Sequence, residues 1–304
     1  MMGISRLGFV QVRVTDLEEA KRHYIESVGL EKTEEKDGKV YLKGWDEWDH
    51  HSVVVEEGGA GLVKMAFKVD QAEDLAELER RIEAYGLKVD RVHRHEDHAV
   101  GDGIKTTLPS GHVVQLYHEA EVVGTRTGQL NPDPWPDELR GMGAPRLDHL
   151  LVSAEDPHEF TRFFTDVLDF KISEKVVPQA GSDQILAAWL FRTNTPHDVA
   201  VIPGPNGKLH HFAFYLDNWN ELLKAGDVMS KHRIPIDVGP TRHGITRGQT
   251  IYFFDPAGNR NEVFSGGYIT YRDFPCITWT ADQLGTGIFY HNRELNERFT
   301  SVLT

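Results

Sequence analysis

The sequence has little cysteine, no excess of positive charge and no long apolar run, and each shortage narrows the function classes. Cys276 is the only cysteine in 304 residues. An intramolecular disulfide and a cysteine-rich zinc site are therefore excluded, as is typical of proteins from a reducing compartment. The formal net charge of -14 repels phosphate backbones, so nucleic acids are not expected partners. Because no segment resembles a signal peptide or a membrane span, we expect a cytoplasmic protein without membrane partners.

What the sequence does contain is an internal repeat. Three pairs of segments match at shifts of 140 or 147 residues, namely residues 7–22 with 147–162, 64–70 with 211–217, and 109–115 with 256–262. The first pair reads as a strand followed by an amphipathic helix, with Asp16 and Asp156 as N-cap residues. The matches predict two copies of a unit made of a strand, a helix and several strands.

The two copies are separated by a stiff connecting segment. Residues 131–136 read Asn-Pro-Asp-Pro-Trp-Pro, which neither a helix nor a central strand accommodates. The length of the chain also favours two domains. We therefore predict an N-terminal domain over residues 1–130 and a C-terminal domain over residues 131–304.

The copies differ at three equivalent positions that matter chemically. The second copy has His149, His211 and Glu262 where the first has Phe9, Lys64 and Gln115. Two imidazoles and a carboxylate form the facial triad that suits non-haem Fe(II) and leaves coordination positions open. Only the C-terminal half can hold a metal in this way.

Each member of this set has a less specific interpretation. A single histidine on a strand is usually a satisfied core or surface residue, and Glu262 could pair with Arg260 or Arg247. An unpartnered buried carboxylate is too costly, so Glu262 must be paired or bound to a metal. His210 beside His211 leaves an ambiguity of one residue, which the repeat alignment resolves in favour of His211 because a slip of one turns the side chain to the other face.

A hairpin carries the most specific motif. Residues 251–254 predict a buried strand, 255–258 a tight turn and 261–264 the returning strand. From Thr241 to Glu262 the sequence reads T-x-H, seven residues, I-Y-x-x-D-P-x-G, three residues and E. This stretch resembles the signature of the type I extradiol ring-cleaving dioxygenases of the vicinal oxygen chelate superfamily, and in particular the catechol 2,3-dioxygenases.

The resemblance extends over nearly the whole chain and implies both a fold and an activity. The implied fold is α+β, with tandem βαβββ modules that form two barrel-like domains and a helical extension at the C-terminus. The implied reaction is extradiol cleavage of catechol or a substituted catechol with O2 to 2-hydroxymuconic semialdehyde or its analogue, in aromatic-compound degradation. A homotetramer is implied as well.

The resemblance also implies roles for six residues. His149, His211 and Glu262 would bind Fe(II), with Mn(II) as the second choice. His197 would be the acid–base residue beside the oxygen site, and His243 and Tyr252 would contact the substrate. From the residues alone, His197 could be a solvated loop residue and Tyr252 a core tyrosine that is bonded to a backbone carbonyl.

A shielded apolar pocket is expected around such a site, since exposed reduced oxygen species would leak or oxidise the metal. Its candidate walls, each of which could equally be core, are Trp189, Ile202, Ile288 and Phe299. Residues 280–283 form a candidate capping box that opens a C-terminal helix, which would either cross the mouth of the pocket or simply pack.

Other histidines are interpreted as solvated loop residues. They are the tract from His93 to His98, the pair His50 and His51 after Asp49, and His112. Two rival functions of the same superfamily stay open at this stage: a metal-dependent glyoxalase-like isomerase and a non-catalytic protein that binds aromatic ligands. Oxygen consumption would exclude both rivals, and a bound metal would argue against the second.

Overall fold

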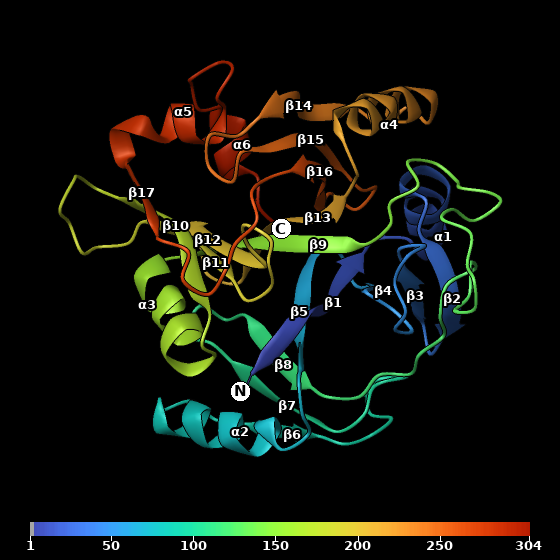
Figure 1. Cartoon of the computed structure of the whole chain (residues 1–304), viewed down its shortest axis with the longest axis horizontal. Coiled ribbons are helices and arrows are strands. Elements are labelled where there is room, and N and C mark those ends of the chain that lie inside the picture. Colours follow the sequence, from blue (N-terminus) through green and yellow to red (C-terminus); the bar gives the residue numbers. More distant parts are fainter. Residues whose placement is uncertain (1–2) are drawn as a thin grey trace.

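Two β-sheets form the framework of the protein, one in each half of the chain, and the longer helices lie around the outside (Figure 1). The computed structural model describes residues 3–304. Among these residues, no helix is long and apolar enough to cross a membrane.

The N-terminal half consists of two consecutive βαβββ modules. The first contains β1 (Ile4–Val14), α1 (Leu17–Lys21) with the π-helical η1 (Arg22–Val28), β2 (Glu31–Lys36), β3 (Lys39–Lys43) and β4 (Val53–Glu57). The second contains β5 (Gly61–Val69), α2 (Asp74–Ala84), β6 (Asp90–Val92), β7 (Gly103–Thr107) and β8 (Val113–Tyr117). The eight strands form one sheet in the order β2-β3-β4-β1-β5-β8-β7-β6.

The C-terminal half repeats this plan and adds an extension. Its first module contains β9 (Leu147–Ala154), α3 (Pro157–Arg162) with η2 (Phe163–Val167), β10 (Lys171–Val177), β11 (Ala187–Phe191) and β12 (Val199–Pro203). Its second contains β13 (Lys208–Tyr215), α4 (Trp219–Lys231), β14 (Ile236–Arg242), β15 (Gly248–Phe254) and β16 (Arg260–Gly266). The extension contains β17 (Ile277–Thr280), η3 (Ala281–Gln283), α5 (Leu284–Ile288) and α6 (Glu297–Ser301). The nine-stranded sheet has the order β14-β15-β16-β13-β9-β12-β11-β10-β17, and the expected α+β fold of tandem modules is confirmed.

Strand register shows that the repeat aligns equivalent positions. In the first sheet Phe9 pairs with Ala66, which pairs with Gln115 on its other side. In the second sheet Ala213 occupies the same central position, between His149 and Glu262. The residues that differ between the copies therefore occupy the same places in the two sheets.

The two halves fill these places differently. In the N-terminal sheet the corresponding face is covered by a cluster of buried side chains: Phe9, Tyr41, Val54, Ala66, Val100 and Tyr117. Beside it, Lys64 Nζ lies 2.6 Å from Asp97 Oδ1. We call the space in front of this face the cup of each sheet. The first cup is filled by apolar groups and one ion pair, whereas the second contains His149, His211 and Glu262.

Of the three helix caps predicted from the sequence, two are present in the structure and one is not. Asp16 and Asp156 each accept a hydrogen bond from the backbone N–H three residues on, at 2.8 and 3.0 Å, so both predicted N-caps are confirmed. The predicted capping box at Thr280 is wrong, because Thr280 makes no side-chain cap bond and the next three residues form a 3-10 turn. The run Leu-Gly-Thr-Gly that follows has weak helix propensity, and α5 is only five residues long.

The solvated-loop interpretation of the N-terminal histidines is wrong for His50, His51 and His112, which are 4%, 5% and 3% exposed. His93 is exposed as expected, but His98 is only partly so. The polar neighbours of these histidines in the sequence give no sign of their burial. Distant segments cover these rings in the folded chain.

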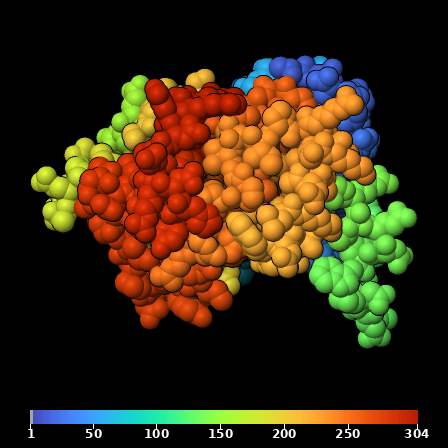
Figure 2. Space-filling model, turned by 90° about the horizontal axis from the view of Figure 1, so that it is seen from above, coloured from blue at the N-terminus to red at the C-terminus, as the bar shows by residue number. Residues whose placement is uncertain are grey.

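The predicted hairpin turn joins the two halves. Asp255 Oδ1 accepts hydrogen bonds from the backbone N–H groups of Ala257 and Asn259 at 2.9 and 2.8 Å, which closes the turn. Asp255 Oδ2 then accepts a bond of 2.7 Å from the Tyr24 hydroxyl of the N-terminal half. The Asn261 side chain reaches His23 Nε2 at 2.8 Å. Residues 118–146 connect the sheets as an irregular segment, part of which projects from the body in green (Figures 1 and 2).

Replacing Tyr24 by phenylalanine tests this junction. Tyr24 is fully buried, and its loss as a donor leaves a buried carboxylate with one partner fewer. We expect Tyr24→Phe to lower the free energy of unfolding by about 1–3 kcal/mol, measured by urea or thermal unfolding. The control is Tyr271→Phe, at a residue that is 66% exposed. Equal stability of the two variants would contradict the prediction.

Candidate active site and metal centre

Three neighbouring strands bring the predicted metal ligands together. His149 lies on β9, His211 on β13 and Glu262 on β16, and these strands are adjacent in the second sheet. The three side chains are 1% to 2% exposed, and their potential ligand atoms all lie within 4.8 Å of one another. The alternating direction of side chains along a strand places them on one face.

The three side chains satisfy only some of one another's polar atoms, since His149 Nε2 is hydrogen-bonded to Glu262 Oε2. His149 Nε2 and His211 Nε2 each lie 3.0 Å from the same oxygen, Glu262 Oε2. Within residues 3–304, His211 Nε2 and Glu262 Oε1 are buried without any hydrogen-bond partner. Buried polar atoms are normally paired, so these orphans indicate a missing partner.

A divalent cation fits this arrangement. Two donors that bind one ion at about 2.0–2.2 Å lie about 2.8–3.6 Å apart for angles between about 90° and 110°. The two distances of 3.0 Å fall within this range. One ion would also give the orphaned His211 Nε2 a partner and neutralise the buried carboxylate. The donor set of two imidazoles and one carboxylate suits Fe(II) or Mn(II) and leaves open positions.

The second nitrogen of each imidazole is held by a sequence neighbour. His149 Nδ1 donates to Asp148 Oδ2 at 2.8 Å. His211 Nδ1 lies 2.7 Å from His210 Nδ1. His210 Nε2 donates to the Phe299 carbonyl at 2.8 Å, which is shorter than its 3.2 Å contact with Arg260 Nη1. Because His210 spends its proton on Phe299, its Nδ1 accepts the proton of His211. Both Nε2 atoms are thereby directed toward Glu262, as in metal sites whose outer partners fix the orientation of the ring.

The pKa shifts follow from burial and this pairing. Burial opposes ionisation of Glu262, but contacts with both imidazoles outweigh it and hold the pKa of the carboxyl well below its ordinary value. Burial alone would lower the pKa of His149, yet bonds to Asp148 and Glu262 raise it to about 9. Burial lowers the pKa of His211 to about 4. Contacts with the two imidazoles thus keep the Glu262 carboxylate ionised, a role that a cation can take over.

Arg260 does not serve as the partner of Glu262, contrary to one of the alternatives considered. Its Nε lies 3.1 Å from Asp237 Oδ2, and both side chains are 1% exposed. The guanidinium therefore neutralises a different buried carboxylate. Arg247 stacks over the Tyr268 ring, with its guanidinium carbon 5.3 Å from the ring centroid.

The predicted acid–base and substrate-contacting residues, His197, His243 and Tyr252, all line the pocket that contains the triad. The His197 ring lies 4.0 Å from the His149 ring between centroids, and His197 Nδ1 is buried without a hydrogen-bond partner in the described chain. Burial, followed by the charge of His149, holds the pKa of His197 well below its ordinary value. His197 is therefore a buried, neutral imidazole, and its interpretation as a solvated loop residue is excluded.

His243 and Tyr252 are linked to each other. His243 Nδ1 donates to the Ile288 carbonyl, so its Nε2 accepts from the Tyr252 hydroxyl at 2.9 Å. The same Nε2 lies 3.8 Å from Glu262 Oε1. The tyrosine thus has a side-chain partner instead of the backbone carbonyl considered from the sequence.

Most of the predicted walls line this pocket, and one does not. Trp189, Ile288 and Phe299 are lining residues. Ile202 lies on β12 and packs in the same apolar cluster, but it does not reach the pocket. The sequence reasoning missed four further lining residues, Leu151, Ile245, Thr246 and Phe264. Leu151 and Phe264 could have been found, because each lies two residues from a triad member on the same strand face.

A buried carboxylate that was not predicted fixes the loop on one side of the pocket. Glu174 is 1% exposed and accepts bonds from the Thr246 backbone N–H at 2.5 Å and the Tyr268 hydroxyl at 2.7 Å. Its other oxygen accepts the Trp279 indole N–H at 2.6 Å. Glu174 therefore ties the pocket loop to the C-terminal extension. In Figure 2 the red atoms of the extension lie against orange atoms of the C-terminal half.

Comparisons with known proteins place the chain among dioxygenases. Residues 146–263 match the family model described as the Glyoxalase/Bleomycin resistance protein/Dioxygenase superfamily, and residues 64–121 match the Catechol 2,3-dioxygenase-like N-terminal domain. The chain is 43% identical to metapyrocatechase from Pseudomonas sp. (strain CF600), over 99% of each chain. It is 29% identical to the manganese-dependent 2,3-dihydroxybiphenyl 1,2-dioxygenase of Geobacillus genomosp. 3, over 96% of this chain and 95% of that one.

A solved structure shares the whole architecture. The 2,3-dioxygenase LapB from Pseudomonas sp. KL28 superposes with a TM-score of 0.89 at 40% identity, covering 93% of this chain and 99% of that chain. With identity above 40% to a full-length relative and the same arrangement of strands, the chain belongs to the extradiol dioxygenases of the glyoxalase/bleomycin resistance protein/dioxygenase superfamily.

Proposed function

We propose that this enzyme is an Fe(II)-dependent catechol 2,3-dioxygenase, which cleaves catechol or a substituted catechol with O2 to 2-hydroxymuconic semialdehyde or its analogue. The observation that carries the proposal is the convergence of two buried imidazole nitrogens on one carboxylate oxygen, in a pocket lined by His197, His243 and Tyr252. The name of the relative from strain CF600 supports the substrate class. Mn(II) is the second choice, and the manganese-dependent relative keeps it open.

In this proposal His149, His211 and Glu262 hold the metal. When bound, Fe(II) would act as a Lewis acid toward the catechol hydroxyls and bring the substrate together with dioxygen. The tautomers fixed by Asp148 and His210 keep both Nε2 atoms free to bind it. Because the ligands come from rigid neighbouring strands, the site needs no reorganisation when it is loaded.

The pocket residues would orient the ring and manage protons. Tyr252 and His243 present a connected polar edge beside Glu262, which suits the catechol oxygens. His197 faces the pocket with an unpartnered nitrogen, so it can hold a proton and return it to a substrate oxygen. Trp189, Ile288 and Phe299 would exclude water from the ring, and positioning supplies much of the rate.

Three further parts of the proposal concern the protein as a whole. We propose a cytoplasmic homotetramer, on the strength of the family resemblance. We propose residues 1–130 as the N-terminal domain and residues 131–304 as the catalytic domain. The irregular segment 118–146 between the two sheets supports limits in this region.

Loading the metal-free enzyme tests the function. The protein is incubated anaerobically with Fe(II) or Mn(II), mixed with catechol and then exposed to air. We expect O2 uptake equal to the catechol consumed and a yellow ring-opened product, with higher activity for Fe(II). An isomerase or a non-catalytic binding protein would consume no O2. Higher activity with Mn(II) would overturn the choice of metal only.

Removing one ligand tests the metal site. His211→Ala takes away one of three protein donors, and we expect it to abolish retention of iron after desalting, measured by metal analysis. The matched control is His291→Ala, at an exposed position on the surface. The ligand assignment fails if His211→Ala retains as much iron and activity as the control.

His197 is expected to affect turnover and not metal binding. His197→Phe preserves a flat ring beside His149 but removes the group that holds a proton. We expect full iron content and a kcat lowered about 10²–10⁴-fold, from steady-state O2 uptake. Iron content serves as the internal control for folding. A wild-type kcat in an iron-loaded variant would show that this side chain handles no proton.

A further inference from the structure

We infer that Glu34, His50 and His98 form a second site for a divalent transition metal such as Zn(II), in the N-terminal half. This half lacks the metal-binding triad, so the site is independent of the proposed catalytic function. The described chain brings two sets of three metal-ligating side chains together, the triad and this group.

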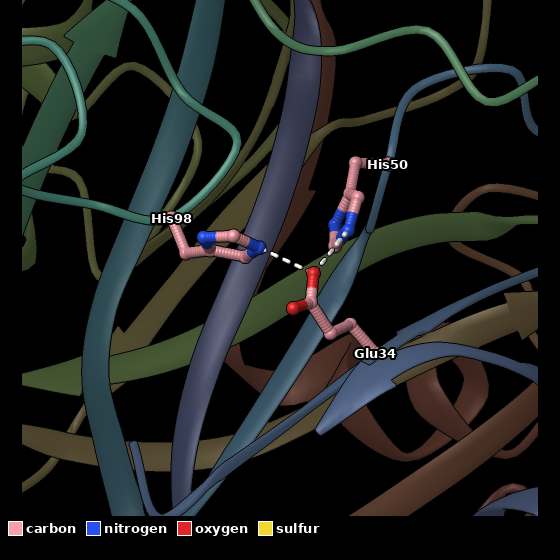
Figure 3. Close-up of side chains that lie close together, drawn as sticks. All are labelled: Glu34, His50 and His98. Carbon is pink, nitrogen blue, oxygen red and sulfur yellow. Dashed lines mark hydrogen bonds and ion pairs between the residues drawn. The ribbon is translucent and has the colours of Figure 1, made fainter. Parts of the chain in front are cut away.

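Side chains from three separate segments converge at the site, as Figure 3 shows. Glu34 lies on β2, His50 precedes β4, and His98 lies in the loop between β6 and β7. His98 Nε2 is 2.5 Å and His50 Nε2 is 3.5 Å from the same oxygen, Glu34 Oε2. His50 is buried, while the side chains of His98 and Glu34 are 22% and 40% exposed.

The pattern repeats that of the triad in the other half. In both groups two Nε2 atoms converge on one carboxylate oxygen, and the ligand atoms lie within 4.8 Å of one another. The separation of 3.5 Å suits two donors on one ion, which lie about 2.8–3.6 Å apart. The separation of 2.5 Å must open by about 0.5 Å, which the partly exposed and flexible Glu34 side chain permits.

The second ring nitrogen of His50 contacts a neighbouring histidine, as that of His211 does. His50 Nδ1 lies 3.1 Å from His51 Nδ1, just as His211 Nδ1 lies 2.7 Å from His210 Nδ1. His51 Nδ1 is placed to accept the proton of His50 Nδ1, as His210 Nδ1 is for His211. His50 can therefore keep its proton on Nδ1 and direct the Nε2 lone pair toward Glu34. Such outer partners are typical of histidines that bind metals.

The competing arrangement is a simple ion pair. Lys36 Nζ lies 3.3 Å from His98 Nδ1, which makes Nδ1 the acceptor and leaves the proton of His98 on Nε2, facing Glu34. A metal at Nε2 requires this proton to move to Nδ1, and the exposed Lys36 must then turn away. Lys36 thus opposes metal binding through both its charge and its hydrogen bond, so its removal separates the two interpretations.

Imidazole and carboxylate donors suit a borderline ion such as Zn(II), with water in the exposed fourth position. The ion would tie the 93–102 loop to β2 and to the segment before β4. These segments cover the filled cup, where Tyr41 contacts the rings of His50, His51 and His98. The expected role is therefore stabilisation of the N-terminal half.

Zinc stoichiometry of the metal-free, full-length protein tests the site. Zn(II) is titrated against a chromophoric chelator. We expect two equivalents for the wild type, one for His98→Gln, one for His211→Ala, and none for the double variant. The site is refuted if the wild type and His98→Gln bind equal amounts. If instead His211→Ala matches the wild type while His98→Gln loses one equivalent, the triad assignment fails and this site stands.

Two further variants keep the test decisive if His98→Gln folds poorly. In the His211→Ala background, Lys36→Met should tighten Zn(II) binding by about 3- to 10-fold, since it removes a nearby positive charge. His93→Gln, at an exposed position in the same loop, should leave binding unchanged. Zn(II) should also raise the thermal unfolding midpoint of the His211→Ala protein but not that of His211→Ala with Glu34→Gln. An ion pair without a metal site would give no zinc-dependent shift and no effect of Lys36→Met.

Discussion

The active site depends on one buried charge. The Glu262 carboxylate is 1% exposed, and transferring such a group from water is prohibitive unless a cation or several donors compensate for it. The buried guanidinium of Arg260 is already paired with Asp237. Glu262 is left with the imidazoles of His149 and His211, each 3.0 Å from its Oε2. The surrounding strands are rigid and apolar, so the carboxylate cannot turn to solvent, and the geometry strongly favours a small divalent ion.

The duplicated fold shows how a small number of residues distinguishes a reactive cup from a filled one. Strand register gives Phe9, Ala66 and Gln115 the positions of His149, Ala213 and Glu262. In the first half the space is occupied by aromatic rings and by the Lys64–Asp97 pair. The same backbone therefore forms either a packed core or a site with open coordination positions. Stability in the first half does not compete with function in the second, because the two uses are separated in the chain.

Much of this could be predicted from the sequence, for identifiable physical reasons. Repeat positions fix strand register, and register fixes which side chains share a face, so the convergence of His149, His211 and Glu262 followed directly. The burial of His50 and His51 did not follow, since it depends on contacts with residues far along the chain, such as Glu121 and His98. The anchoring role of Glu174 was equally hidden, because its three donors lie more than 70 residues away. Ile202 packs in the apolar cluster beside the pocket, as its face of β12 predicts, but it lies too far along the strand to reach the pocket itself.

The C-terminal extension connects the wall of the pocket to the orientation of a ligand. Phe299 contributes its ring to the pocket, and its carbonyl accepts the proton of His210. That bond obliges His210 to accept at Nδ1, which in turn leaves His211 Nε2 unprotonated toward Glu262. Thr304 holds the end of the chain in place by pairing with the backbone of Leu209 in both directions. Phe299 therefore serves both the pocket wall and the tautomer of His211, so an enzyme whose extension is displaced would lose both.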